Sequence, residues 1–216
     1  MPIVIIILLL ITAIVFPKMI QYNRSHYKEE SGNGLRTTIF NKENYKEFLA
    51  YTYLEEYETY GKLITNRQFI GKGQNPINLE LVMINETGIY IFDVNSYKGL
   101  VKGDGTGGHW THHDKKKEEP FQNPIWENKE RIRLFKEMFP QIHESPMKSF
   151  VLFNNECTLE IDQKNVENHV VLKMKELIKY LNEDILKSEK VFSKKEIDNI
   201  YEVVKKETIK RETPRD

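Results

Sequence analysis

Two apolar segments near the middle of the chain, separated by a short turn, constrain the fold most strongly. Residues 77–84 and 89–94 are rich in β-branched and aliphatic side chains, and Asn85-Glu86-Thr87-Gly88 joins them. Two such runs, split by a short turn that contains glycine, are typical of an antiparallel β-hairpin. The chain is therefore expected to build a β-sheet around this hairpin.

Periodic segments on both sides of the hairpin indicate an α/β fold. A helix is expected to follow Asn123-Pro124 and to end at Phe139, and the wholly apolar run 150–153 is typical of a buried strand. Ser193 and Glu196 have the spacing of a helix-capping box. Further helices are expected over residues 42–60, 166–187 and 194–207, and further strands over residues 62–70 and 100–102. This order predicts one mixed sheet flanked by helices.

Composition narrows the class of protein. The chain has 216 residues, with 32 basic and 32 acidic side chains, so its formal net charge is zero. This balance argues against a generally basic nucleic-acid-binding surface. The single cysteine, Cys157, excludes a disulfide scaffold and favours a reducing compartment.

The first 20 residues predict a membrane anchor. Residues 3–16 are apolar apart from Thr12, and the run extends to Ile20 with Lys18 as the one charged side chain. Such a segment is about as long as the roughly 20-residue helix that crosses a bilayer. No basic residue precedes it, which argues against a cleaved signal peptide. Basic residues follow it, so the positive-inside rule predicts an outside N-terminus and a cytoplasmic domain.

The rest of the chain divides into a domain and its flanking segments. Residues 21–38 are expected to be a polar juxtamembrane linker, 39–160 the main domain, 161–209 C-terminal helices and 210–216 a frayed, charged tail. Residues 103–119 are glycine-rich and charged, and are expected to form a loop. This segment contains His109, His112 and His113, which lack the spacing of a zinc site and are expected to be solvated.

Two acidic residues interrupt the apolar hairpin. Glu80 lies in the middle of the first strand, and Asp93 lies near the end of the second. A carboxylate is costly to bury unless it has a partner, and two oxygen ligands on one sheet face could bind Mg²⁺ or Mn²⁺. The alternative is that both carboxylates face solvent from the polar side of the sheet.

Several segments together resemble the nuclease-related domain (NERD) family. The resemblance rests on residues 78–84, on Gly88 to Tyr97 followed by Gly99, and on the downstream residues Gly103, Trp110 and Asn123-Pro124. Glu47 stands seven residues before Leu54, as the helix glutamate of the family precedes its leucine. The resemblance covers roughly residues 42–155 and implies a fold similar to that of the PD-(D/E)xK nucleases.

The resemblance also implies a site. By position, the first acid is Glu80, the second acid is Asp93, the lysine position holds Asn95, and the helix glutamate is Glu47. In such nucleases the acids hold Mg²⁺ or Mn²⁺, which polarises the scissile phosphate, and the lysine helps to activate water. Glu80 and Asp93 are accordingly the expected metal ligands.

Departures from the family pattern concern the polar positions. Glutamate replaces the usual first aspartate, aspartate replaces the usual second glutamate, and Asn95 can act neither as a cation nor as a base. We therefore expect a membrane-anchored protein whose domain is catalytically impaired and serves in binding or scaffolding. The alternative is an active metal-dependent nuclease, cleaving DNA or RNA, in which Lys98 or Lys102 replaces the missing lysine. Nucleic acid is a candidate partner; the sequence identifies no protein partner.

Overall fold

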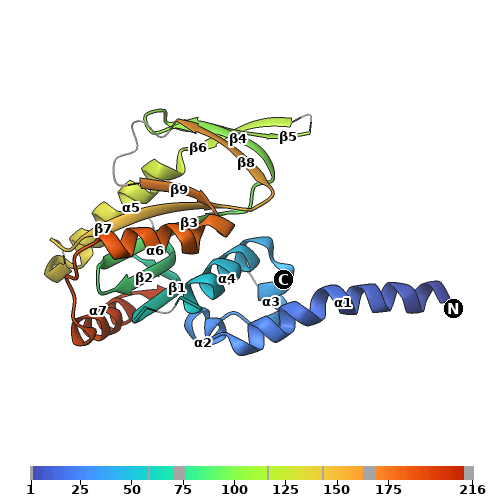
Figure 1. Ribbon diagram of the computed structural model, residues 1–216, viewed down its shortest axis with the longest axis horizontal. Helices are drawn as coiled ribbons and strands as arrows, with labels where there is room; N and C mark the ends of the chain where they lie inside the picture. The colour runs from blue at the N-terminus through green and yellow to red at the C-terminus, as the bar shows by residue number, and fades with distance from the viewer. Residues whose placement is uncertain are drawn as a thin grey trace.

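The computed structural model describes residues 2–57, 59–70, 76–115, 117–142, 144–162 and 169–211, and it shows two mixed β-sheets flanked by helices (Figure 1). The helices are α1 (Pro2–Arg24), α2 (Tyr27–Ser31), α3 (Leu35–Phe40), α4 (Lys42–Glu55), α5 (Pro124–Met138), α6 (Leu177–Lys187) and α7 (Lys194–Glu207). The strands are β1 (Gly61–Phe69), β2 (Ile77–Asn85), β3 (Gly88–Asn95), β4 (Gly99–Asp104), β5 (His109–Asp114), β6 (Lys117–Gln122), β7 (Met147–Phe153), β8 (Cys157–Asp162), β9 (His169–Lys173) and β10 (Ile209–Lys210).

The larger sheet contains the predicted hairpin at its centre. Its strand order is β10-β1-β2-β3-β7-β9, in which β1, β2 and β3 are antiparallel, and β7 runs parallel to both β3 and β9. A mixed sheet flanked by helices is therefore confirmed, but the structure has two mixed sheets where the sequence predicts one. A parallel pair needs a crossover, and α5 lies in the connection between β3 and β7.

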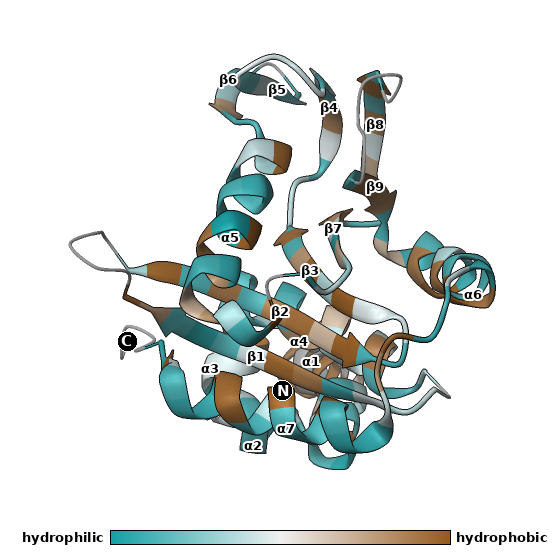
Figure 2. Ribbon diagram, turned by 90° about the vertical axis from the view of Figure 1, so that its left-hand side faces the viewer, coloured by the Kyte–Doolittle hydropathy of each residue, from teal (hydrophilic) through white to brown (hydrophobic). Residues whose placement is uncertain are grey.

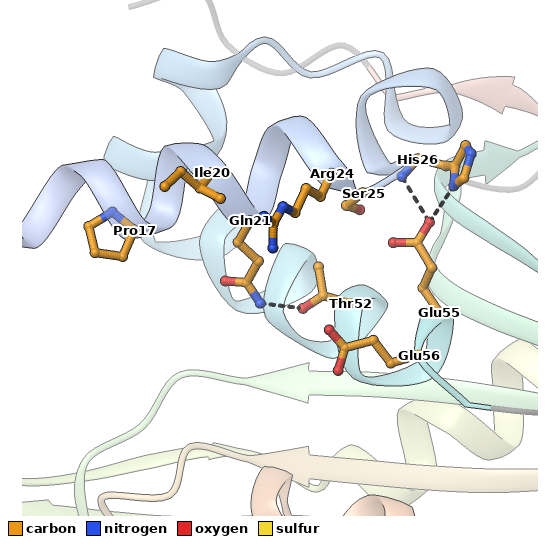
Figure 3. A pocket seen from close by; sticks show the side chains of 9 residues that line it. All are labelled: Pro17, Ile20, Gln21, Arg24, Ser25, His26, Thr52, Glu55 and Glu56. Carbon is orange, nitrogen blue, oxygen red and sulfur yellow. Dashed lines mark hydrogen bonds and ion pairs between the residues drawn. The ribbon is translucent and has the colours of Figure 1, made fainter.

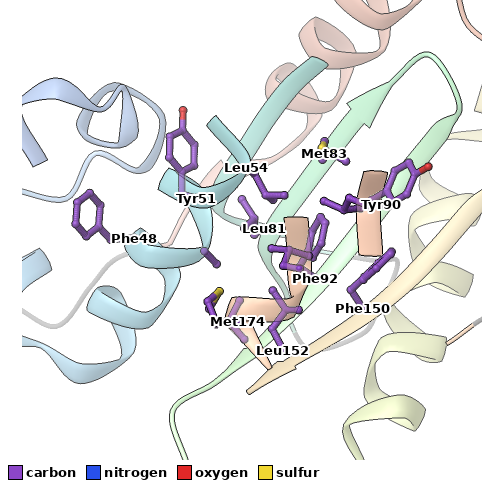
Figure 4. Close-up of a cluster of buried hydrophobic side chains, with 14 of the residues drawn as sticks. Phe48, Tyr51, Leu54, Leu81, Met83, Tyr90, Phe92, Phe150, Leu152 and Met174 are labelled. Carbon is purple, nitrogen blue, oxygen red and sulfur yellow. The ribbon is translucent and has the colours of Figure 1, made fainter. Parts of the chain in front are cut away.

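Helices cover both faces of this sheet, so its central strands are buried. On one face, Phe48 and Leu54 of α4 and Leu181 of α6 pack against apolar side chains of β2, β3 and β7 (Figure 4). On the other face, Phe135 of α5 and Ile200 of α7 pack against residues of β1, β2 and β3. Figure 2 shows apolar residues along the central strands β2 and β3, whereas β1 and the helices carry both apolar and hydrophilic residues.

Residues 103–119, expected to be a loop, instead contribute to a second sheet. Its order is β6-β5-β4-β8, and its strands pack around Trp110, Val101 and Phe153. The loop prediction was wrong because the exposed positions of these strands carry charged and histidine side chains. The few apolar positions between them therefore do not form a recognisable strand pattern in the sequence. Among the histidines, the ring of His112 contacts the backbone oxygen of Lys98.

The N-terminal region also differs from expectation. Within the described residues, none of the helices has both the length and the apolar character that a membrane span requires, so the transmembrane helix expected over residues 1–20 finds no support. Residues 21–38, expected to be a linker, contain the end of α1, all of α2 and the start of α3, and Tyr27 is fully buried against Phe48 and Tyr51. In Figure 1, α1 extends away from the body of the molecule.

The C-terminal region completes the larger sheet. The helix expected over 166–187 was wrong in its first part, where β9 forms the edge of the sheet and α6 begins only at Leu177. The capping box of Ser193 and Glu196 at the start of α7 is confirmed. Lys210 is not frayed, because it pairs with Arg67 of β1. The remainder of the predicted tail, 212–216, lies outside the described residues.

Candidate active site

A fork between two strands positions the first acid. The described pairing of β2 with β3 runs from Asn85 and Gly88 to Leu81 and Phe92. Just beyond it, the carboxylate oxygen Oε2 of Glu80 accepts a hydrogen bond of 2.9 Å from the backbone N–H of Val94. Val94 pairs with Leu152 of β7 on its other side, and the side chain of Glu80 supplies the acceptor on the β2 side, where the pairing with β2 has ended. This contact satisfies a buried backbone donor where the ladder ends.

The second acid is enclosed by side-chain donors. Oδ1 of Asp93 lies 2.6 Å from Nη1 of Arg131, and Oδ2 accepts a 2.6 Å hydrogen bond from Nδ2 of Asn95. The same guanidinium nitrogen donates to Oδ1 of Asn128, whose own amide donates to the hydroxyl of Ser149 on β7. Asn128 thus fixes the part of α5 that carries Arg131. Both carboxylate oxygens of Asp93 have a protein donor.

A lysine from α4 approaches the first acid. Nζ of Lys46 lies 3.9 Å from Oε1 of Glu80 and 2.6 Å from Oε2 of Glu43, and its side chain is only 14% exposed. Glu43 in turn accepts a hydrogen bond of 3.2 Å from the hydroxyl of Ser96, just after β3. Lys46 therefore places an ammonium group beside the site even though Asn95 stands at the expected lysine position.

The helix glutamate, Glu47, is buried on the opposite side of α4 from solvent. Its Oε1 lies 2.5 Å from the hydroxyl of Thr65, and that hydroxyl lies 2.8 Å from the backbone oxygen of Glu80. Its Oε2 accepts a 2.6 Å hydrogen bond from Nη2 of Arg211. Thr65 thus links Glu47 to the strand that carries the first acid.

Glu80 connects the other two acids: Thr65 links Glu47 to the backbone of Glu80, and the negative charge of Asp93 acts on the Glu80 carboxyl. Burial raises the pKa of Glu47 to about 7; Arg211 opposes this increase and the nearby Glu80 adds to it. Burial also raises the pKa of Glu80, and the negative charge of Asp93 raises it further, against the opposing effect of Lys46. We call Glu47, Glu80 and Asp93 the acidic site. The family resemblance groups these three residues into one site, and that grouping stays a prediction. The alternative in which Glu80 and Asp93 face solvent does not hold, because both side chains are largely buried.

The lysines expected to replace the missing cation lie elsewhere. Nζ of Lys98 pairs with Glu156 at 2.8 Å, and Nζ of Lys102 pairs with Glu160 at 2.9 Å. Lys102 and Glu160 are direct neighbours on β4 and β8 of the second sheet. The predicted substitution by Lys98 or Lys102 is therefore not what the structure shows.

Sequence reasoning missed the cations that do reach the acidic site. Lys46 immediately precedes Glu47, and Arg131 lies one helical turn after Glu127, which it approaches to 3.6 Å. Both residues lie inside continuous helices, α4 and α5, and become neighbours of the two acids only where these helices cover the sheet. Burial works against a charged Arg131, yet Asp93 and Glu80 raise its pKa.

The arrangement does not fit a divalent cation. Mg²⁺ and Mn²⁺ need several free oxygen ligands in near-octahedral geometry. Here the oxygens of Asp93 and one oxygen of Glu80 already accept from protein donors, and Arg131 supplies positive charge at the carboxylate. Among the residues with described positions, no group of three or more His, Cys, Asp or Glu side chains is arranged to hold a metal ion. Metal binding by Glu80 and Asp93 stays a prediction that this geometry does not favour.

A separate cavity of about 580 Å³ lies where α1 meets α4 (Figure 3). His26 and Glu55 form an ion pair of 2.7 Å at its edge, and Gln21 donates to the hydroxyl of Thr52. The lining residues are Pro17, Ile20, Gln21, Arg24, Ser25, His26, Thr52, Glu55 and Glu56, so the cavity is distinct from the acidic site.

The forked sheet belongs to a mixed α/β domain, with an acid on each of two neighbouring strands and a glutamate on the covering helix. The sequence profile described as "Nuclease-related domain" matches residues 42–154, and the chain belongs to this family, which is related to the PD-(D/E)xK nucleases. An uncharacterized protein of Bacillus anthracis is 22% identical over 171 residues, which cover 78% of this chain and 74% of that protein. No solved structure matches the chain.

Proposed function

We propose that this nuclease-related domain is catalytically impaired and serves in binding or scaffolding. The observation that carries the proposal is the enclosure of Asp93, whose two carboxylate oxygens are held by Arg131 and Asn95. Hydrolysis of a phosphodiester needs an activated water and a group that stabilises the developing charge on phosphate. Asn95 cannot accept a proton as a base, and its amide here engages the acid that would otherwise bind a metal.

The test is a cleavage assay on the purified full chain with Mg²⁺ or Mn²⁺ and single-stranded DNA, double-stranded DNA and RNA. We expect no metal-dependent cleavage above that of a Glu80→Gln variant. A Glu160→Gln variant is the matched control, because Glu160 forms its ion pair with Lys102 in the second sheet, away from the acidic site. Cleavage by the wild type that Glu80→Gln abolishes and Glu160→Gln preserves would contradict the proposal.

One observation favours the second candidate, an active nuclease with a relocated lysine. Lys46 lies 3.9 Å from Glu80, so a cation is present beside the first acid after all. If this function is correct, the same assay shows cleavage by the wild type that Lys46→Gln abolishes. The absence of cleavage in the wild type rejects it.

We further propose that α1 associates with the cytoplasmic face of a membrane. Support comes from its exposed aliphatic side chains, including Ile5 at 56% and Leu9 at 63% exposure, and from the basic residues that follow them. The full chain is expected to sediment with membranes, and an Ile5→Asp/Leu9→Asp variant to shift largely to the supernatant. The control is Leu186→Asp, at an exposed leucine on α6. Equal sedimentation of all three proteins would reject the proposal.

A further inference from the structure

The C-terminal segment returns to the sheet edge nearest the acidic site. After α7, Thr208 is buried, and β10 pairs antiparallel with β1 through Ile209 opposite Gln68 and Lys210 opposite Arg67. This segment lies beyond residues 42–154, the part of the chain that matches the family. A segment outside the matched part therefore lies next to a site whose acids all lie within it.

The C-terminal segment contacts β1 at Asn66, where the backbone of the strand is irregular. Asn66 has a φ of 54°, and it falls between the paired residues Thr65 and Arg67, which lie opposite Leu81 and Leu79. A left-handed conformation is uncommon for residues other than glycine but is tolerated by asparagine. The backbone oxygen of Asn66 accepts a 2.9 Å hydrogen bond from the N–H of Arg211, and its Oδ1 accepts another of 2.9 Å from Nε of Arg211.

These contacts aim the end of the Arg211 side chain at the acidic site. With its backbone N–H and Nε held by Asn66, the guanidinium presents Nη2 to Oε2 of Glu47 at 2.6 Å. Glu47 is 2% exposed, so this pair is shielded from water and only weakly screened by salt. A buried carboxylate is costly unless a positive charge compensates it. Arg211 provides that charge to Glu47.

We infer that residues 208–211 form an intramolecular latch, in which Arg211 positions Glu47 and prevents this carboxylate from sharing a divalent cation with Glu80. This latch rests on the proposed function, in which the acidic site binds no metal. Residues 208–211 are the segment that keeps Glu47 paired with Arg211. Without Arg211, Glu47 loses the cation that contacts its Oε2, whereas Glu80 keeps Lys46. Oε2 of Glu47 is then available to a divalent cation. Arg211 is thus a positioning residue that acts through Glu47.

The experiment is a calorimetric titration of the full chain with Mn²⁺ at pH 8. We expect Arg211→Gln to bind Mn²⁺ at least about tenfold more tightly than the wild type, and an Arg211→Gln/Glu47→Gln variant to lose this gain. A merely structural role for Arg211 does not predict this reversal. Arg133→Gln is the matched control, because Arg133 pairs with exposed Glu130 and Glu137 on α5 and is expected to leave Mn²⁺ binding unchanged.

The conservative variant Arg211→Lys keeps the charge but cannot make both the Asn66 and the Glu47 contacts. Its Mn²⁺ affinity is expected to lie between those of the wild type and Arg211→Gln, and it serves as the test if Arg211→Gln does not fold. A folded Arg211→Gln or Arg211→Lys protein with wild-type Mn²⁺ affinity would overturn the latch. Unchanged Mn²⁺ affinity in these variants would not affect the proposed function. Metal-dependent cleavage by the wild type would instead reject the proposed function, and the Mn²⁺ affinities of the variants could still be compared.

Discussion

Replacing Arg131 with glutamine is expected to lower the free energy of unfolding by about 3 kcal/mol, the loss typical of breaking a buried ion pair from one side. The side chain of Asp93 is 6% exposed, and Arg131 contributes the 2.6 Å contact to its Oδ1. Glutamine leaves this carboxylate buried and uncompensated. We place the effect at the lower end of the range for such pairs because Arg131 itself is 15% exposed. Urea denaturation at pH 7 measures the change.

Two further variants separate this ion pair from general damage to α5. Arg133→Gln, on the same helix, removes an exposed arginine and is expected to cost less than about 1 kcal/mol. The double variant Arg131→Gln/Asp93→Asn removes both charges and is expected to recover most of the loss. A loss as small as that of Arg133→Gln, or no recovery in the double variant, would show that Asp93 does not depend on Arg131.

Replacing Gly103 with alanine is expected to cost about 3 kcal/mol, at the upper end of the usual range for overpacking. An alanine Cβ at this position would lie 2.3 Å from Cγ of Trp110, far inside van der Waals contact. Trp110 cannot move away easily, since it is fully buried and its indole N–H donates to the backbone oxygen of Asp104 at 2.8 Å. The melting temperature and the near-ultraviolet circular dichroism of the tryptophans measure the effect.

Gly34→Ala is the matched control for this substitution. A Cβ at Gly34 meets nothing within 4 Å, and its φ of −72° is ordinary for alanine. We expect the control to change stability by less than about 1 kcal/mol, in line with a surface substitution and the modest loss of a glycine cap. If Gly103→Ala proved as mild as Gly34→Ala, the second sheet would have to be more adaptable than its packing around Trp110 indicates.

The residues that could be predicted from sequence are those whose roles depend on local patterning. The hairpin over 77–94 and the strand over 150–153 were correct because continuous apolar runs bounded by turns have few alternatives in a sheet covered on both faces. Glu80 and Asp93 stand out in the sequence because they interrupt such runs. Residues Gly103, Trp110 and Asn123 supported the family resemblance, and the structure shows that they pack or cap the scaffold.

The cations could not be predicted, because their placement depends on how helices lie across the sheet. Lys46, Arg131 and Arg211 come from three separate segments, and no spacing in the sequence links them to Glu80, Asp93 and Glu47. Asn95 stands where the family resemblance places a lysine, and the two lysines that the sequence offered instead, Lys98 and Lys102, pair with Glu156 and Glu160. The second sheet was missed for a similar reason, since its strands are recognisable only through their partners.

Glu80 serves the architecture as well as the site, because its carboxylate supplies the acceptor that Val94 loses where β2 and β3 separate. Natural selection can retain such a residue for strand geometry alone, long after any hydrolytic role has disappeared. An acid at this position in a related protein is therefore poor proof that the protein is a working enzyme. To separate active from inactive members of the family, the groups that surround the neighbouring aspartate, Asp93 in this chain, should be compared instead.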